Sequence, residues 1–269
     1  MAAPPPRPGF PARLDLGGAG RPPAGVAAAR PPLPAAHAGA LAAAAIAAPP
    51  PPRDAIPARG RMVQQLAAGG IADAAVLRAM GAVERHRFVD SALAPQAYED
   101  TALPIGLGQT ISKPSVVARM AELLLQGGLR GADGRLGRVL DIGTGCGYQA
   151  VVLAQLASEV YSIERLRDLH EKARANLRPL RIANVHLILG DGMAGFASGA
   201  PYAGIIAAAG GEAVPEAWIE QLACGGRIVA PVAAGEGQQA LVVIDKSRQG
   251  VRRGVLEAVN FVPLKSGVA

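Results

Sequence analysis

The sequence predicts an α/β fold built on a mostly parallel, doubly wound sheet. Short apolar runs alternate with helical segments from about residue 139 to residue 262, and strands joined through helices form parallel sheets with right-handed crossovers. The first run, residues 139–142, leads into a turn with three glycines and then into a helix-forming segment. Because ligands of such sheets lie at the carboxyl ends of the central strands, we expect the functional site at this turn.

The alternation gives seven strands. The predicted strands are residues 139–142, 159–164, 185–189, 204–208, 227–230, 241–244 and 256–262. The predicted helices are residues 62–66, 73–80, 149–157, 166–177 and 215–222, together with one that begins at Lys113 and ends at Gly127. Asp73 is expected to be the N-cap of its helix.

The first 60 residues differ in composition from the rest of the 269-residue chain. They contain 15 of the 23 prolines and a single aromatic residue, Phe10. Such a segment lacks the apolar side chains needed for a core, so we predict a disordered tail rich in polyproline II over residues 1–60. The tail also carries six arginines against two aspartates. It therefore supplies most of the net positive charge, which is weak evidence for nucleic-acid binding by the folded part.

Membrane insertion and export are not favoured. The apolar run at residues 38–48 is too short to span a bilayer, and it follows several Pro–Pro steps without a compact basic start, which argues against a signal peptide. Export stays open as the alternative. The two cysteines, Cys146 and Cys224, form neither a disulfide framework nor a metal-ligand cluster. We therefore expect a cytoplasmic protein without a bound metal.

The turn after residue 142 has the pattern D-x-G-x-G-x-G, formed by Asp141, Gly143, Gly145 and Gly147. Glycines allow backbone N–H groups between a strand and a helix to approach a nucleotide-like ligand. A dinucleotide fingerprint would place its third small residue at Tyr148, which is too large. The pattern instead resembles the cofactor loop of S-adenosylmethionine (AdoMet) methyltransferases. A tight turn without a ligand is the alternative.

Two further acids fall at predicted strand ends. Glu164 ends the strand 159–164, where an acid accepts hydrogen bonds from ribose hydroxyls in nucleotide-binding folds. Asp191 lies between two glycines after the strand 185–189, in a position to meet an adenine amine or a ribose edge. Either acid alone would be ordinary solvated surface. Together with the glycine turn, they predict a single site.

Residues 98–112 form a long segment with proline and glycine but no helical period. Long loops in compact domains are usually binding elements. The last residue, Ser112, directly precedes the helix that begins at Lys113, so one interpretation of Ser112 is a helix N-cap. His86 is a candidate base, although a lone histidine beside two arginines is more often structural.

Residues 62–264 resemble the protein-L-isoaspartate O-methyltransferases. The more specific motifs are GQTIS at residues 108–112, followed by Pro114, and DTALPIG at residues 100–106. Supporting motifs are RHRFV at residues 85–89, GDG at 190–192, QLACGGR at 221–227 and FVPL at 261–264. The resemblance covers about three quarters of the chain and leaves out the tail.

The resemblance implies a seven-stranded Rossmann-like methyltransferase domain over residues 61–269, with a helical substrate-side region at 61–130 and the Rossmann-like core at 131–269. It implies AdoMet as methyl donor and L-isoaspartyl residues of age-damaged proteins as acceptors, with no nucleic acid or membrane as partner. Ser112 matches the serine assigned as catalytic in the family. The expected cofactor-binding residues are Gln109, Thr110, Ile111, Asp141, Gly143, Thr144, Gly145, Gly147, Glu164, Asp191 and Gly192.

Methyl transfer to a carboxylate needs no general base, because the carboxylate is already a nucleophile at pH 7 and the sulfonium methyl group is a strong electrophile. The enzyme has to place the two groups in line and exclude water. We therefore expect the Ser112 hydroxyl to orient the acceptor carboxylate rather than to attack or to accept a proton.

Several positions depart from the family pattern, namely Glu84, Lys113, Ser115, Ala203 and the run at 207–211, which lacks the usual threonine. The last two are expected beside the cofactor and substrate pockets. Two other classes stay open. One is an AdoMet methyltransferase that acts on a small molecule or RNA, against which the GQTIS motif argues. The other is a non-catalytic AdoMet-binding module, favoured only by the losses at Ala203 and Ala208.

Overall fold

The computed structural model describes residues 54–235 and 237–269. Residues 1–53 of the predicted tail, which include its apolar run at residues 38–48, lie outside the described residues. Helix α1 (Ala55–Ala68) begins earlier than the predicted domain, and the Ala55 side chain is buried. The boundary predicted between residues 60 and 61 therefore falls inside a helix.

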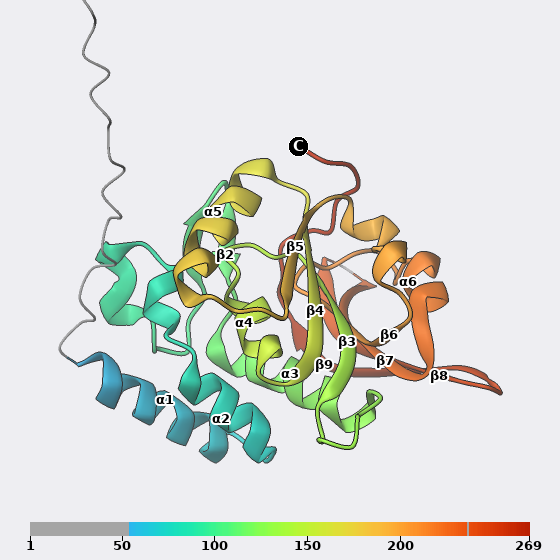
Figure 1. Cartoon of the computed structure of the whole chain (residues 1–269), viewed down its shortest axis with the longest axis horizontal. Coiled ribbons are helices and arrows are strands. Elements are labelled where there is room, and N and C mark those ends of the chain that lie inside the picture. Colours follow the sequence, from blue (N-terminus) through green and yellow to red (C-terminus); the bar gives the residue numbers. More distant parts are fainter. Residues whose placement is uncertain (1–53, 236) are drawn as a thin grey trace, which may run out of the picture. The chain divides into compact units, whose positions relative to one another are not determined.

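A seven-stranded sheet forms the centre of the described region (Figure 1). Its strand order is β5-β4-β3-β6-β7-β8-β9, with parallel neighbours from β5 to β7 and antiparallel pairing of β8 and β9. The strands are β3 (Leu136–Ile142), β4 (Ala157–Glu164), β5 (Val185–Leu189), β6 (Tyr202–Ala207), β7 (Leu222–Gly235), β8 (Gln238–Ser247) and β9 (Gly250–Val259). The predicted seven-stranded, mostly parallel α/β fold is confirmed.

Two hydrophobic cores lie on opposite faces of this sheet. Alternating strand residues divide between them, so that Val139 packs into the core shared with α1 to α5 and Leu140 into the core that holds Trp218 of α6. The remaining helices are α2 (Ala74–Ala82), α3 (Pro114–Gly127), α4 (Tyr148–Ala154), α5 (Arg167–Leu177) and α6 (Glu216–Gln221), with short 3₁₀ helices η1 (Arg85–Phe88), η2 (Ser91–Gln96), η3 (Arg178–Leu180), η4 (Gly192–Ala194) and η5 (Ala197–Gly199). Burial of both strand faces explains why the strands read as continuous apolar runs.

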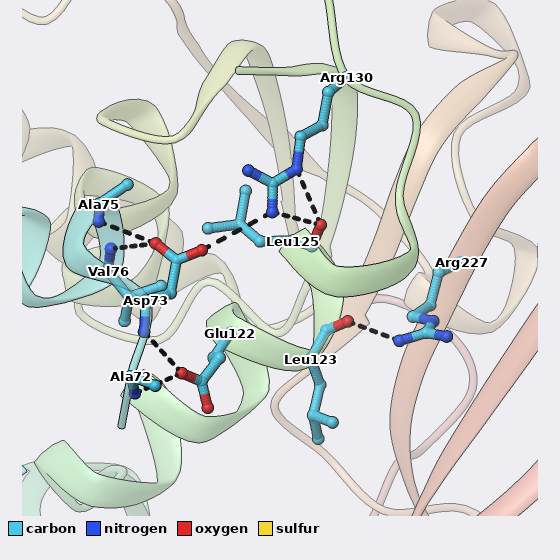
Figure 2. Close-up of polar contacts among 9 residues, drawn as sticks. All are labelled: Ala72, Asp73, Ala75, Val76, Glu122, Leu123, Leu125, Arg130 and Arg227. Carbon is cyan, nitrogen blue, oxygen red and sulfur yellow. Dashed lines mark hydrogen bonds and ion pairs between the residues drawn. The ribbon is translucent and has the colours of Figure 1, made fainter. Parts of the chain in front are cut away.

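A buried carboxylate ties α3 to α2. Glu122 of α3 is 2% exposed, and its Oε1 accepts hydrogen bonds from the N–H groups of Ala72 (2.7 Å) and Asp73 (2.9 Å) (Figure 2). The Asp73 carboxylate in turn accepts from the N–H groups of Ala75 and Val76 and caps α2, as predicted. A buried acid is tolerated when its oxygens are hydrogen-bonded in this way.

An arginine fixes α3 to the sheet from the other side. Arg227 of β7 donates from Nη1 to the Leu123 carbonyl at 2.9 Å (Figure 2) and forms two hydrogen bonds to the Asp245 carboxylate on β8. These hydrogen bonds hold the Asp245 pKa below its usual value. Helix α3, which begins two residues after Ser112, is thus attached on both sides.

Several elements differ in extent from the sequence prediction; strand β9, for example, spans Gly250–Val259 rather than residues 256–262. The helix predicted over residues 149–157 ends at Ala154, because β4 already begins at Ala157. The segment 98–112 is not a structureless loop, since it contains an antiparallel hairpin of β1 (Leu103–Gly106) and β2 (Gln109–Ile111). Strands β7 and β8 extend well beyond their predicted apolar centres and pair along most of their length.

Candidate active site

The glycine loop joins β3 to α4 at the carboxyl edge of the sheet. Gly143, Gly145 and Gly147 have φ angles of 91°, 55° and 91°, in a region that L side chains rarely adopt. A Cβ at Gly147 would lie 2.5 Å from the Leu177 side chain, and one at Gly145 would lie 3.2 Å from that of Ile105. The spacing of the glycines is therefore required by the path of the backbone and by its close packing.

A buried polar network supports the loop. The Asp141 carboxylate is fully buried and accepts hydrogen bonds from Gln149 Nε2 (2.8 Å) and Ser162 Oγ (2.7 Å). Ser162 Oγ also lies 2.7 Å from Thr144 Oγ1, within the loop. Burial raises the pKa of Asp141 to about 6. The predicted cofactor acid thus lies behind the loop, where it holds the loop in place.

Glu164 ends β4 next to the glycine loop. Its Oε2 accepts a hydrogen bond from Gly145 N–H at 2.9 Å, and its Oε1 accepts one from Leu166 N–H at 2.9 Å. Each carboxylate oxygen has capacity for a further hydrogen bond. Glu164 is therefore fixed by the loop and has acceptor capacity left for the hydroxyls of a ligand.

Ser112 does not cap α3. The N-cap residue is Lys113, whose side chain makes no capping hydrogen bond. Asp100 caps the helix instead, because its carboxylate accepts from the backbone N–H (2.8 Å) and the hydroxyl (2.7 Å) of Ser115. The N-cap interpretation of Ser112 is thus wrong, since a carboxylate distant in sequence fills that role.

Helix α5 holds the hairpin close to the glycine loop. Lys172 Nζ donates to the Ile105 carbonyl of β1 at 2.7 Å. The side chains of Ile105 and Ile111 are both 4% exposed. The hairpin therefore has one buried face, and β2 leads into Ser112 at its end.

A buried arginine connects the segment before the hairpin to α4. Arg85 Nε donates to the Ala97 carbonyl at 2.8 Å and Nη2 to the Thr101 carbonyl at 3.4 Å. Its guanidinium carbon lies 4.9 Å from the centre of the Tyr148 ring, a cation–π arrangement. Burial lowers the Arg85 pKa. This contact gives a structural role to Arg85 of the RHRFV motif and to the large side chain of Tyr148. It lies where the helical region meets α4.

These elements enclose a cavity of about 300 Å³. The predicted site residues on its wall are Gln109, Thr110, Ile111, Ser112, Gly143, Thr144, Gly145, Glu164 and Gly192. The predicted site residues Asp141, Gly147 and Asp191 are not among the wall residues. The structure thus brings the glycine loop, Glu164 and Ser112 to one cavity.

Residues 58–269 match the family model described as protein-L-isoaspartate(D-aspartate) O-methyltransferase. The chain belongs to this family. It is 56% identical over 266 residues to the protein-L-isoaspartate O-methyltransferase of Methylibium petroleiphilum, covering 97% of each chain. It is 59% identical to that of Leptothrix cholodnii, covering 78% of this chain and 74% of the relative.

Solved structures of protein-L-isoaspartate O-methyltransferases have the same fold. One matches with a TM-score of 0.69 at 28% identity, covering 78% of this chain and 67% of the other. A second, a putative enzyme of the family from Plasmodium falciparum in complex with S-adenosyl-L-homocysteine, matches with a TM-score of 0.65 at 25% identity, covering 77% and 98%. The expected family, enzyme class and cofactor are confirmed.

Several residues on the cavity wall of this chain were not predicted. They include Ile105, Leu107, Cys146, Leu166, Leu169 and residues 262–265. The FVPL motif at 261–264 was the available signal for the last group, but its role cannot be deduced without the path of the chain. Ala208 lies on the wall, as expected.

The expectation for Ala203 is wrong. This residue lies near the amino end of β6, away from the carboxyl edge, and a Cβ at Gly137 would lie 3.2 Å from its side chain. It is not a wall residue. The departure at Ala203 therefore concerns packing between strands rather than the cavity.

His86 also lies away from the cavity wall. Its Nδ1 is 2.7 Å from Tyr98 Oη, and burial lowers its pKa. This placement agrees with the structural interpretation of His86. Within the described part of the chain, no helix combines the length and apolar character needed to cross a bilayer. The same residues contain no group of three or more His, Cys, Asp or Glu side chains that could hold a metal.

Proposed function

We propose that the chain transfers the methyl group of AdoMet to the α-carboxylate of L-isoaspartyl residues in damaged proteins, at the cavity described above. One observation carries the proposal: the glycine loop with Glu164 and the GQTIS segment with Ser112 line the same cavity. The first set has the chemistry of a nucleoside site and the second is the motif specific to the family. Methyl donor and acceptor would therefore meet between β3 and β2.

AdoMet would be held by the loop and the acid next to it. The positive φ angles keep side chains out of the loop, so the ligand can approach its backbone closely. Glu164 is held by Gly145 and Leu166 and would accept hydrogen bonds from the ribose hydroxyls. Asp141 would contribute by holding Thr144 and α4, through the Ser162 and Gln149 side chains. These roles use the residues without requiring any of them to titrate during the reaction.

The acceptor carboxylate would lie beside Ser112. The Ser112 hydroxyl is not used to cap α3, so it is available to donate a hydrogen bond to the acceptor. The attack is a displacement at the sulfonium methyl group, in which the carboxylate oxygen forms the new C–O bond and S-adenosylhomocysteine (AdoHcy) leaves. Ser112 would align the carboxylate, and apolar wall residues such as Ile105 and Leu169 would exclude water. The resulting methyl ester would then cyclise to a succinimide with loss of methanol, without further help from the enzyme.

We also propose the expected division of the chain, in which residues 61–130 face the acceptor and residues 131–269 hold the cofactor. Placement of the hairpin in the first part and of the glycine loop and Glu164 in the second supports this. A cytoplasmic location is proposed because Cys146 and Cys224 are both free thiols, which suits a reducing compartment.

The test combines cofactor binding with methyl transfer. Isothermal titration should show AdoMet binding, and the chain should methylate a peptide that contains L-isoaspartate but not the same peptide with normal aspartate. Binding without transfer would favour a non-catalytic module. Transfer only to RNA or to a small molecule would replace the proposed acceptor.

A further inference from the structure

A second cavity lies between the helical region and the last strand of the sheet. Its volume is about 800 Å³, whereas the first cavity, which is lined by the glycine loop and Ser112, has about 300 Å³. The wall of the second cavity includes Arg61, Gln65 and Leu66 of α1, Val116 and Arg119 of α3, and residues 257–259 of β9. We call this second cavity the flank groove.

The flank groove combines an apolar lining with a polar rim. Met62 of α1 and Leu241 of β8 line it and are buried. Arg61 and Gln65, one helical turn apart on α1, line it as well and are exposed to solvent. Binding sites for organic ligands have this character, with apolar contact area and a small number of polar groups at defined places.

Strand β9 contributes one wall and is the edge strand of the seven-stranded sheet. It pairs with β8 on one side, and on its other side no strand of the described residues pairs with it. Arg119 Nε of α3 donates to Glu257 Oε1 of β9 at 3.0 Å, which joins two walls of the groove. A polypeptide segment can bind along a free strand edge through main-chain hydrogen bonds, which do not depend on its sequence.

The flank groove adjoins the first cavity at the start of α3. Ser112 and Val117 line the first cavity, while residues 115–116, which lie between them in the sequence, line the flank groove. The chain that leaves β9 repeats this arrangement, since Val259 lines the flank groove and Val262 lines the first cavity. A ligand group that reaches Ser112 therefore has the flank groove next to it.

The first cavity has room for a small molecule but not for a polypeptide as well. Pockets for small molecules have volumes of roughly 300–1,000 Å³, and the first cavity, at about 300 Å³, is at the lower end of this range. It therefore suits the cofactor and the reacting carboxylate. Because the proposed acceptor is one residue within a polypeptide, the neighbours of that residue must lie outside the first cavity.

We propose that the flank groove binds the residues that flank the isoaspartyl residue of the acceptor. The proposal rests on the proposed function, because it requires a polypeptide acceptor with its carboxylate at Ser112. Buried residues such as Leu241 meet the apolar side chains of the flank, the edge of β9 meets its backbone, and Arg61 and Gln65 meet its polar groups. The groove thus strengthens binding of the acceptor and takes no part in the transfer of the methyl group.

The experiment compares acceptors of different length on the full-length chain. One acceptor is a blocked isoaspartyl tripeptide, and two others extend it by five residues, on the N-terminal or the C-terminal side alone. At least one extension should lower KM about tenfold, since it adds contacts in the groove. Gln65→Trp fills the groove and should return that KM to within about twofold of the tripeptide value, with kcat unchanged, as expected for loss of binding shared by ground and transition states.

Two comparisons separate this effect from damage to the fold. Gln65→Trp should leave the KM of the tripeptide and the dissociation constant of AdoMet unchanged, because neither ligand reaches the groove. The matched control is Gln64→Trp, at the preceding residue of α1, which is also exposed but does not line the groove. This variant should leave the KM of all three peptides unchanged.

Equal KM values for the three peptides on the unchanged chain would overturn the proposal. Equal increases for tripeptide and extended peptide in Gln65→Trp would also overturn it, as would an unchanged KM for the extended peptide. A second measurement uses the unchanged chain and an extended peptide with a benzophenone side chain in its flank, which should crosslink to groove residues of α1 or β9. Crosslinks found only elsewhere would contradict the proposal. Failure of the proposed function looks different, because the tripeptide itself would not be methylated.

Discussion

The carboxylate of Asp100 caps α3 by accepting two hydrogen bonds from Ser115, one from its N–H at 2.8 Å and one from its hydroxyl at 2.7 Å. Asp100 lies in the DTALPIG segment, before the hairpin, and Ser115 lies in the first turn of the helix after it. The pair therefore closes the ends of the segment that carries GQTIS. It also makes a family departure, the serine at 115, part of the local structure, and it leaves the Ser112 hydroxyl free of a structural role.

We predict that Asp100→Ala lowers the free energy of unfolding by about 1–2 kcal/mol, because it removes the cap of α3. Ser115→Ala should cost less, since the Ser115 N–H can still donate to Asp100. Urea denaturation followed by circular dichroism measures both. Equal losses in the two variants would show that the hydroxyl, and not the capped backbone, carries the interaction.

The glycine loop and Glu164 could be placed from the sequence because their roles are local. A strand that ends in a glycine turn has few possible backbone paths. Glu164 is the last residue of the next apolar run along the chain, which places it at the end of the neighbouring strand. The roles of Asp191 and Ser112 depend on partners distant in sequence. Asp191 meets Gly267, and Asp100 takes the capping role predicted for Ser112. No local sequence pattern indicates such pairings, so both contacts were missed.

The error at Ala203 has the same origin. The resemblance places the residue in a motif near the site, but its effect depends on which end of β6 it occupies. Register decides this, since Val139 pairs with Gly204 and Ile142 with Ala207. Ala207 is thus at the carboxyl edge with the glycine loop, while Ala203 is near the opposite end of the strand.

Replacement of Glu164 should weaken AdoMet binding. Glu164→Ala removes the proposed ribose acceptor and a partner of Gly145 N–H, so the dissociation constant should rise by roughly 10- to 100-fold, or about 1.4–2.8 kcal/mol. Glu164→Gln keeps one acceptor oxygen and should show a smaller loss. Isothermal titration checks both, with circular dichroism to verify that each variant is folded. Unchanged affinity in Glu164→Ala would mean that the ribose is bound elsewhere.

Asp141 should make stability depend on pH. Burial raises its pKa from 3.8 to about 6, so between these values the folded state binds more protons than the unfolded state. The contribution of this group is therefore present at low pH and lost as the pH rises from about 4 to 6, a change of about 3 kcal/mol. Asp141→Asn removes the titration while an amide keeps the hydrogen bond from Gln149. Its free energy of unfolding should change less between pH 4 and pH 7 than that of the unchanged chain. Parallel curves for the two proteins in urea titrations would assign the pH dependence to other groups.

We predict that residues 1–53 are dispensable for catalysis, on the basis of their composition. The truncation must leave α1 intact, because the Asp54 carbonyl accepts a hydrogen bond from Ala58 N–H and Ala55 is buried. A chain that starts at Asp54 should keep its AdoMet affinity and turnover, whereas one that starts near Arg59 should be less stable. A tenfold loss of turnover in the chain that starts at Asp54 would show that the tail contributes to the reaction.

The last prediction concerns Ser112 itself. Because Asp100 caps α3, Ser112→Ala should leave the free energy of unfolding within about 0.5 kcal/mol of the unchanged chain. If the hydroxyl orients the acceptor carboxylate, the same variant should lower kcat/KM for an isoaspartyl peptide by a factor of roughly ten to a thousand, which corresponds to about 1.4–4 kcal/mol of transition-state stabilisation. AdoMet affinity should be nearly unchanged, since the glycine loop and Glu164 are intact. Ser112→Thr keeps a hydroxyl and should recover part of the activity, while Ser112→Asn should remain folded, bind AdoMet and methylate poorly. Ser112→Ala with full turnover would leave the hydroxyl without a part in catalysis, and the backbone N–H groups of the GQTIS segment would then be the remaining donors for the carboxylate.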